Sequence, residues 1–411
     1  PSRPGGGTPR GDRFPPAAEA AARPPPAGPA GAACYAFSGL ATLAARACRS
    51  LPPRRTDLSR FPGVDFIEFD ALLTEEQRLI RDTVRAWVED KVKPIIEDCH
   101  REGRTPLELV PEMGRLNLFG STLSDYGLPG LDSVSYGLIM QELERGDSGL
   151  RSFASVQSSL VMYPIHAFGS PEQKDRWLPR LATGEAIGCF GLTEPDFGSN
   201  PGGMLTKAVD DGDSYVLNGA KMWITNGAVS DTELGDVFLV YARVEGAPRS
   251  KLSMFIVEKG FGGFALGQKI KSKLGMRAST TAELVFEDCE VPAENRVGEE
   301  GDATLHMMRN LEIERLGLAA MSLGIARRCV EVMNRYASER RSFGQPLRDF
   351  GQVQRHLAEA ELWREQPARR AVLPSGGRHP LLPRLERFLQ PHRRPLPAHG
   401  HAATARTQRS R

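Results

Sequence analysis

The stretch GCFGLTEPDFGSN, residues 188–200, carries the most information about the fold and the site. A short apolar strand ends at Thr193, and a polar turn follows in which Pro195 fixes the backbone and Gly198 permits another group to approach closely. Backbone N–H groups in this turn, with the hydroxyls of Thr193 and Ser199, could bind the edge of a flat polar heterocycle. Taken alone, the stretch is also compatible with an ordinary turn.

A second segment, WITNG at residues 223–227, ends a later strand pattern. Trp223 at the mouth of a sheet could shield one face of a bound ring, although a Trp in this position is also compatible with a place in the core. Upstream of it, Asn218-Gly219 lies between SYVL and AKMWIT and predicts a hairpin turn.

The periodicity of apolar residues changes twice along the chain. A capping-box pattern at Thr74 opens a helical region, and further helical patterns cover 105–118, 133–145, 150–168 and 171–183. Period-two strand patterns then occupy 187–193, 206–210, 214–225, 237–243, 252–258 and 282–287, before helical patterns return at 303–338 and 349–363. Because strands do not alternate with helices, the order predicts an α+β fold and not a doubly wound nucleotide-binding fold.

This order predicts three folded domains between two unpatterned ends. We expect an N-terminal helical domain at 64–186, a middle β-barrel-like domain at 187–298 and an incomplete C-terminal helical-bundle domain at 299–366. Residues 1–63 are rich in Pro, Ala, Gly and Arg and poor in acids, which predicts a transit peptide or a disordered segment. Residues 367–411 show no helix or strand period, which predicts a disordered tail or the product of a shifted reading frame.

The composition excludes several classes of protein. Hydrophobic residues make up 40% and charged residues 25% of the 411 residues, and the net charge of +2 gives no general attraction to nucleic acid or an anionic membrane. No apolar run is long enough to span a bilayer. The six cysteines form no C-x-x-C pair, so we expect no zinc site, no other metal site and no disulfide framework, in a reducing compartment.

Together, the two polar segments resemble the acyl-CoA dehydrogenase family over about residues 66–363. LTEPDFGSN matches the family pattern L-T-E-P-x-x-G-S-D, with Asn200 in place of Asp, and WITNG matches as it stands. The other matching segments are LGMRAS (274–279), FEDCEVPAENRVGEE (286–300) and ERRSFGQPL (339–347). The resemblance implies a dimer or tetramer with FAD bound between subunits and an electron-transferring flavoprotein as partner.

The resemblance also assigns residues to the cofactor. Residues on the isoalloxazine side of FAD would be Phe190, Gly191, Leu192, Thr193, Ser199, Trp223, Ile224 and Thr225. Residues that reach the FAD of a neighbouring subunit would be Arg340, Phe343 and Gln354. Outside the family pattern, Arg340 is compatible with a solvated charge at a helix end.

The reaction needs a base over the α-carbon of the substrate. The segment LEIERL at 311–316 resembles LDLERL of isovaleryl-CoA dehydrogenases, in which the second carboxylate is the base, and Glu314 is the matching position. Glu312 and Arg315 match residues near the CoA moiety. The alternative for Glu314 is a surface charge on an amphipathic helix.

Residues 143–170, in contrast, resemble glutaryl-CoA dehydrogenases. In that resemblance Arg151 pairs with the distal carboxylate of the substrate, helped by Glu144 and Ser152, and Ser199 also contacts the substrate. An Arg offers a bidentate fork to a carboxylate in a closed pocket. The alternative is a helix surface Arg in a salt bridge with Glu144 or Asp147.

The two halves of the sequence therefore favour different substrates. We expect an FAD-dependent dehydrogenase of a short acyl-CoA in the mitochondrial matrix, with glutaryl-CoA favoured because the pocket end comes from the N-terminal half. The alternatives are a branched short-chain substrate such as isovaleryl-CoA, an acyl-CoA oxidase, and an inactive, truncated homologue.

Overall fold

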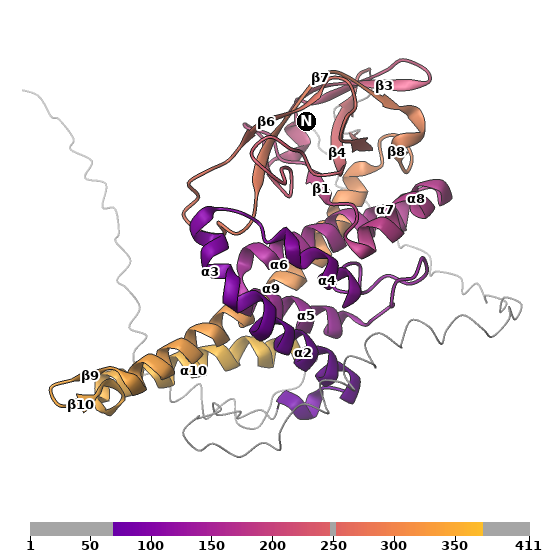
Figure 1. Ribbon diagram of the computed structural model, residues 1–411. Helices are drawn as coiled ribbons and strands as arrows, with labels where there is room; N and C mark the ends of the chain where they lie inside the picture. Colours follow the sequence, from indigo (N-terminus) through magenta and orange to yellow (C-terminus); the bar gives the residue numbers. More distant parts are fainter. Residues whose placement is uncertain (1–68, 247–251, 373–411) are drawn as a thin grey trace, which may run out of the picture.

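The computed structural model describes residues 69–246 and 252–372, and one sheet lies above a group of helices (Figure 1). The predicted α+β fold, with helices before and after a β region, is confirmed. The predicted transit peptide at 1–63 and the tail from residue 373 onward lie outside the described residues. Within the described ranges no helix is long and apolar enough to cross a membrane.

The N-terminal helices begin at the predicted capping box. The Thr74 hydroxyl accepts a hydrogen bond from the Gln77 backbone N–H at 3.1 Å, and the Gln77 side chain accepts one from the Thr74 N–H at 3.0 Å. The helical segments are η1 (Phe69–Leu72), α2 (Glu75–Trp87), the π-helix η2 (Val88–Val92), α3 (Lys93–Glu102), η3 (Leu107–Leu109), α4 (Val110–Arg115), α5 (Ser133–Gly146), α6 (Ser148–Ser155), the π-helix η4 (Val156–Met162), α7 (Tyr163–Phe168) and α8 (Pro171–Thr183).

The sheet separates two parts of the core. Along β4 (Val237–Val244), residues 237, 239 and 241 belong to the core shared with the helices, whereas residues 238, 240 and 242 belong to a second core on the opposite face. The strand order is β6-β7-β3-β2-β4-β5-β8, with β1 parallel to β4. The other strands are β1 (Gly188–Gly191), β2 (Lys207–Asp210), β3 (Ser214–Thr225), β5 (Leu252–Glu258), β6 (Phe264–Lys269), β7 (Thr281–Pro292) and β8 (Arg296–Val297), with 3₁₀ turns η5 (Pro201–Gly203) and η6 (Ala293–Asn295).

The predicted hairpin at Asn218-Gly219 is wrong. Both residues lie inside β3, which runs unbroken from Ser214 to Thr225, and the pairing of β3 with β7 shifts register between Leu217 and Gly219. A Cβ on Gly219 would lie 2.7 Å from the Thr206 Cα. The Asn-Gly pair therefore marks a β-bulge and a close backbone approach, which also require glycine.

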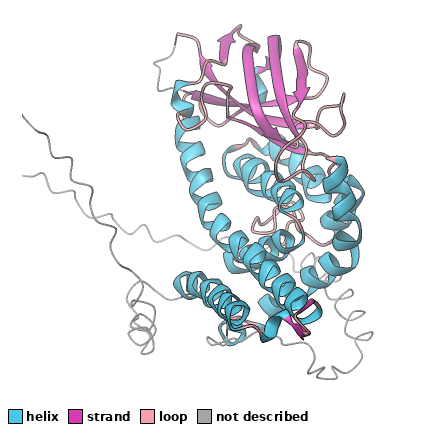
Figure 2. Cartoon of the chain, turned by 90° about the vertical axis from the view of Figure 1, so that its left-hand side faces the viewer, coloured by secondary structure: helices cyan, strands magenta, loops and turns pink. Residues whose placement is uncertain are grey.

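The C-terminal helices begin with the long helix α9 (Ala303–Glu339), which packs against α5 and α10 (Gly351–Val372) (Figures 1 and 2). Between α9 and α10 lie the hairpin β9 (Arg341–Ser342) and β10 (Gln345–Pro346) and the 3₁₀ turn η7 (Leu347–Asp349). Helix α10 extends beyond residue 366, so the described part of the predicted tail, up to Val372, is helical and not without structure.

Candidate active site

The structure brings the two polar segments of the sequence together at one end of the sheet. The Met222 N–H donates to the Thr193 carbonyl at 2.8 Å, which joins the end of β3 to the loop after β1. As a result, the predicted isoalloxazine contacts from Phe190 to Thr193 lie beside those from Trp223 to Thr225. Ser199 is exposed in the same loop.

Trp223 is the most unusual residue of this end of the sheet. Its φ is 65°, a left-handed conformation that a bulky residue rarely adopts, and the residue is 59% exposed. The core alternative for Trp223 is therefore wrong. Strained backbone conformations occur preferentially at ligand sites, and an exposed indole offers a flat surface on which an aromatic ring can stack.

A buried ion pair, which the sequence interpretation missed, supports this surface. The Lys221 ammonium has no exposed surface and donates to Glu194 at 2.8 Å and to the Leu192 carbonyl at 3.3 Å. Glu194 in turn accepts from the backbone N–H groups of Leu205 at 2.5 Å and Thr206 at 2.9 Å. The sequence did contain a signal for this ion pair, because Lys221 is a charged residue in an apolar strand pattern, two positions before Trp223.

Burial and pairing affect the two charges in opposite ways. Burial lowers the pKa of Lys221 to about 8, although Glu194 opposes the change. Burial alone would raise the pKa of Glu194, but Lys221 and the two backbone donors hold it below its usual range. Near neutral pH both groups are charged, and the pair ties together the three segments around Trp223.

A second group of polar side chains lies between helices α5, α6, η4 and α9. We call it the inter-helix cluster. Its members are Tyr136, Glu144, Arg151, Ser152, Ser155, Ser159 and Glu314. All of them are buried except Glu314, which is half-buried.

Arg151 is the cation of the inter-helix cluster. It is 9% exposed, its Nε donates to Glu144, and its Nη1 donates to the Ser155 hydroxyl at 3.2 Å. The expected salt bridge with Glu144 is present, but it is buried, so the helix-surface alternative for Arg151 is wrong. The hydrogen bonds of Arg151 to other described residues use Nε and Nη1 and not Nη2. Ser152 contributes its carbonyl, which accepts from Ser155 at 3.3 Å.

Ser159 connects this cation to Glu314. Its Oγ lies 2.7 Å from the Ser155 carbonyl, contacts the Glu314 carboxyl, and lies 3.4 Å from the Tyr136 hydroxyl. A serine has one hydroxyl proton and a carbonyl oxygen can only accept. While Ser159 donates to the Ser155 carbonyl, the contact with Glu314 has to use a proton on Glu314.

The environment of Glu314 favours that proton. Burial raises the pKa of Glu314 to about 7, and the attraction of Arg151 only partly opposes the shift. Burial, with a further contribution from Glu314, raises the pKa of Tyr136 well above its ordinary value, so Tyr136 stays a neutral donor. Glu314 is thus a carboxyl that can gain or lose a proton near neutral pH, and it is not the surface charge of the alternative prediction.

The remaining predicted residues lie outside the inter-helix cluster. Glu312 and Arg315 are exposed on α9. Arg340 follows the end of α9, Phe343 is 95% exposed with a φ of 49°, and Gln354 is exposed on α10. Along α9, Glu314 and Arg340 are separated by roughly 39 Å at 1.5 Å per residue. The structure therefore does not bring Arg340 to the base within one chain.

Tyr136, Ser155 and Ser159 were not predicted from the sequence. Arg151, Ser155 and Ser159 recur at intervals of four residues, and this polar stripe on an apolar helix was the available signal. The π-helix η4, which contains Ser159, gave no signal in the sequence, although such segments often mark functional sites. Within the described residues no group of three or more His, Cys, Asp or Glu could hold a metal ion.

Comparisons with known proteins place this chain in a family. Three family models match: the acyl-CoA dehydrogenase N-terminal domain at residues 74–185, the middle domain at 189–289 and the C-terminal domain at 304–372. The short-chain specific acyl-CoA dehydrogenase of Clostridium acetobutylicum is 43% identical over 66% of this chain and 70% of its own length. The mitochondrial short-chain specific acyl-CoA dehydrogenase of Rattus norvegicus is 37% identical over 71% and 69%, respectively.

A solved structure shows the same fold. The crystal structure of a glutaryl-CoA dehydrogenase from Mycobacterium smegmatis, in complex with FADH2, superposes with a TM-score of 0.69 at 42% identity, covering 74% of this chain and 76% of that chain. The three family models together match most of the chain, and the relatives are well above 30% identical over two thirds or more of both lengths. The resemblance seen in the sequence is confirmed, and the chain belongs to the acyl-CoA dehydrogenase family.

Proposed function

We propose that this protein is an FAD-dependent acyl-CoA dehydrogenase that removes hydrogen from the α- and β-carbons of a short acyl-CoA, with Glu314 as the base. The observation that carries the proposal is the half-buried Glu314 carboxyl, whose pKa burial raises to about 7, in contact with Ser159 and near Arg151. A general base works best when its pKa lies near the operating pH. The two halves of the chain, which favour different substrates by resemblance, contribute to one cluster.

The end of the sheet fits the cofactor. Trp223 offers an exposed ring surface, and the loop from Leu192 to Ser199 offers backbone donors and hydroxyls for a polar ring edge. FAD, when bound, supplies the two-electron acceptor chemistry that the reaction needs. Phe190, Gly191, Leu192, Thr193, Ser199, Trp223, Ile224 and Thr225 would hold it. The FADH2 bound to the glutaryl-CoA dehydrogenase of Mycobacterium smegmatis supports FAD as the cofactor.

In the reaction, Glu314 has to take the α-proton of the substrate. The ionised carboxylate does this, and the resulting carboxylic acid is the form that the buried surroundings favour. Ser159 orients the carboxyl and can donate to it or accept from it, because its own proton can turn between Glu314 and the Ser155 carbonyl. Tyr136 stays protonated and keeps a donor directed at Ser159.

Glutaryl-CoA is the favoured substrate because Arg151 is buried and retains an unused donor. Nε and Nη1 are engaged by Glu144 and Ser155, which leaves Nη2 for a carboxylate at the far end of an acyl chain. The product of oxidation could then lose its distal carboxylate as CO2. Glu312 and Arg315, exposed on α9, would lie near the CoA moiety, and Ser199 near the substrate.

A branched short acyl-CoA such as isovaleryl-CoA is the second candidate. The buried pair between Arg151 and Glu144 is already neutral, so the pocket can also accept an uncharged acyl end. The short-chain specificity named for the relative from Clostridium acetobutylicum supports a short acyl chain.

The separation along α9 supports assembly with a second copy. Arg340 lies roughly 39 Å along the helix from Glu314, a span longer than the cofactor itself, so the two residues would serve different flavins. We therefore propose a homo-oligomer, a dimer or tetramer, in which Arg340, Phe343 and Gln354 contact the FAD of a neighbouring subunit. The mitochondrial location named for the relative from Rattus norvegicus supports a mitochondrial location for this protein. We propose the matrix as its place and an electron-transferring flavoprotein as the acceptor, as the family resemblance implies.

The test is an anaerobic titration of the purified protein with glutaryl-CoA and, separately, with isovaleryl-CoA, while flavin bleaching is followed by absorbance. Bleaching by glutaryl-CoA at the lower concentration supports the favoured substrate, and the reverse order supports the branched substrate. No flavin band would refute the dehydrogenase proposal, and no bleaching by either compound would refute both candidate substrates. Rapid oxygen consumption without an added flavoprotein acceptor would indicate an oxidase instead.

A further inference from the structure

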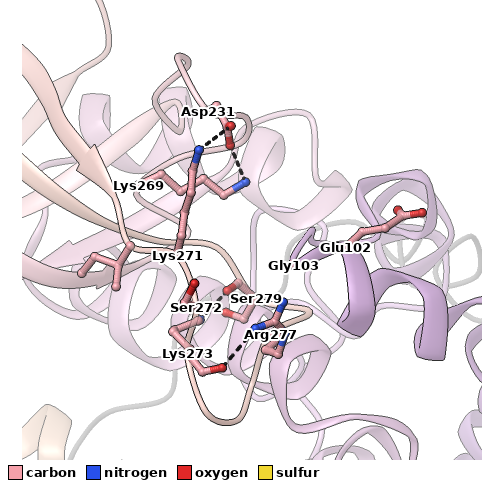
Figure 3. A pocket seen from close by; sticks show the side chains of 10 residues that line it. Glu102, Gly103, Asp231, Lys269, Lys271, Ser272, Lys273, Arg277 and Ser279 are labelled. Atoms are coloured by element: carbon pink, nitrogen blue, oxygen red, sulfur yellow. Dashed lines mark hydrogen bonds and ion pairs between the residues drawn. The ribbon is translucent and has the colours of Figure 1, made fainter.

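A pocket separate from both groups of residues lies where the end of α3 meets the loop between β6 and β7 (Figure 3). Its cavity measures about 270 Å³. One wall is the turn at Glu102 and Gly103, and the other is the loop from Lys269 to Ser279, with Asp231 at its edge. None of these residues belongs to the inter-helix cluster or to the surface around Trp223.

The acids of the pocket do not balance its cations. The lining contains four cations and two carboxylates. Lys269 and Lys271 share the single carboxylate of Asp231, at 2.9 Å and 2.8 Å, as the dashed lines in Figure 3 show. The other acid, Glu102, accepts from Arg104 at 2.8 Å and is already paired with a cation outside the lining.

The other two cations are held by neutral oxygen atoms. Lys273 donates to the Ser279 carbonyl at 2.5 Å and to the Thr281 hydroxyl at 2.8 Å. Arg277 donates to the carbonyls of His100 at 3.0 Å and Arg101 at 3.2 Å, at the end of α3. These bonds fix the positions of both charges without neutralising them. Burial and the nearby Arg277 hold the pKa of Lys273 below its usual range, and the attraction of the Asp147 carboxylate only partly opposes the shift.

A buried donor in the same lining also lacks a partner. Ser279 is 2% exposed, and its Oγ has no hydrogen-bond partner among the described residues. Buried hydroxyls in folded proteins are nearly always hydrogen-bonded, so an orphaned hydroxyl in a cavity wall points to a ligand. The ligand would have to carry negative charge for the lysines and an acceptor oxygen for Ser279.

We propose that this pocket binds a phosphate group. A phosphate carries several acceptor oxygens and a compact negative charge, and lysine ammonium groups bind it as point charges. Lys273 and Lys271 would face the charge, and Ser279 would donate to one oxygen. The phosphate could come from free inorganic pyrophosphate or from a nucleoside diphosphate, and the cavity has room for more than a single phosphate ion.

The proposal is tested by calorimetric titration of the full flavin-loaded protein with pyrophosphate, adenosine diphosphate and adenosine, each alone. Loading with flavin prevents the cofactor site from taking up the nucleotide. We expect saturable binding of both phosphate compounds, with an affinity that falls as salt rises, and no binding of adenosine. Tighter binding of the nucleotide identifies a nucleoside diphosphate as the source, and tighter binding of pyrophosphate identifies a free polyphosphate.

Three variants make the test specific. Lys273→Met should raise the dissociation constant at least tenfold, and Ser279→Ala, which is close to isosteric, should raise it about threefold. Lys207→Met removes an exposed lysine of β2 outside the pocket and should change nothing. Flavin absorbance of each variant reports whether the fold is kept. Absence of saturable binding, equal binding of adenosine, or binding that survives both pocket substitutions would overturn the proposal.

Discussion

The surface around Trp223 and the inter-helix cluster are built in opposite ways. The first comes from segments that pair with each other in one sheet, and a buried ion pair between Lys221 and Glu194 fixes it from below. The second comes from separate helices, and the contact between Ser159 and Glu314 joins residues 155 positions apart. One region is held by backbone pairing and a buried ion pair, whereas the other depends on the protonation of a single carboxyl.

The largest effect should follow from Glu314→Gln. The substitution keeps the size and the contact with Ser159 but removes the base, and loss of a general base costs about 10²- to 10⁴-fold in turnover. Stopped-flow measurement of flavin reduction checks this. Flavin binding should be unchanged, because Trp223 and its neighbours are untouched. Near-full turnover with bound flavin would contradict the role of Glu314.

Lys221→Met should damage the other region. Removing one partner leaves the Glu194 charge buried and unpaired, which costs about 3–5 kcal/mol in the free energy of unfolding. We expect lower stability in urea denaturation and weaker flavin retention. Lys207→Met is the matched control: it breaks an exposed pair with Glu245 at 3.8 Å, which is worth at most about 1 kcal/mol. Equal stabilities of the two variants would show that the buried pair does not support the sheet.

The raised pKa of Glu314 predicts a pH-dependent stability. Its folded-state pKa of about 7 lies above the unfolded value of 4.5, so the folded state binds the proton more tightly. The stabilisation is fully present below pH 4.5 and is lost as pH rises through about 7, by roughly 3 kcal/mol. Glu314→Gln cannot titrate. Its unfolding free energy relative to the unsubstituted protein should therefore increase across this range, and parallel pH profiles would contradict the shift.

The smallest of these effects should be the change in substrate preference caused by Arg151→Lys. The charge and the pair with Glu144 can persist, but the fork that engages a distal carboxylate is lost. We expect kcat/KM for glutaryl-CoA to fall about tenfold and kcat/KM for isovaleryl-CoA to stay within about twofold. The ratio of the two values is the measurement. Equal losses for both substrates would show that Arg151 positions the helix and does not select the acyl end.

The same contrast explains what could be predicted from the sequence. The Trp223 region could be predicted because its residues lie in two short contiguous segments of the sequence. Its place between two helical regions could be predicted from the change in the period of apolar residues. Asn218-Gly219 misled the prediction because a bulge and a hairpin both need glycine, and only the pairing of β3 with β7 distinguishes them. Ser159 and Tyr136 could not be assigned, since their role depends on how α5 and η4 pack against α9. Lys273 and Ser279 form a pocket only once the loop has folded against α3.

The length of α9 has a genetic consequence. Suppose that each flavin site takes Glu314 from one subunit and Arg340, at the far end of α9, from the neighbouring subunit. A variant without Glu314 and a variant without Arg340 would then both be inactive, because each loses one of the two residues in every site. Refolded together, they would form mixed assemblies in which one site collects both defects and its counterpart has none. Two inactive alleles of this protein would then complement each other, and the recovered activity would show that each site is shared between subunits.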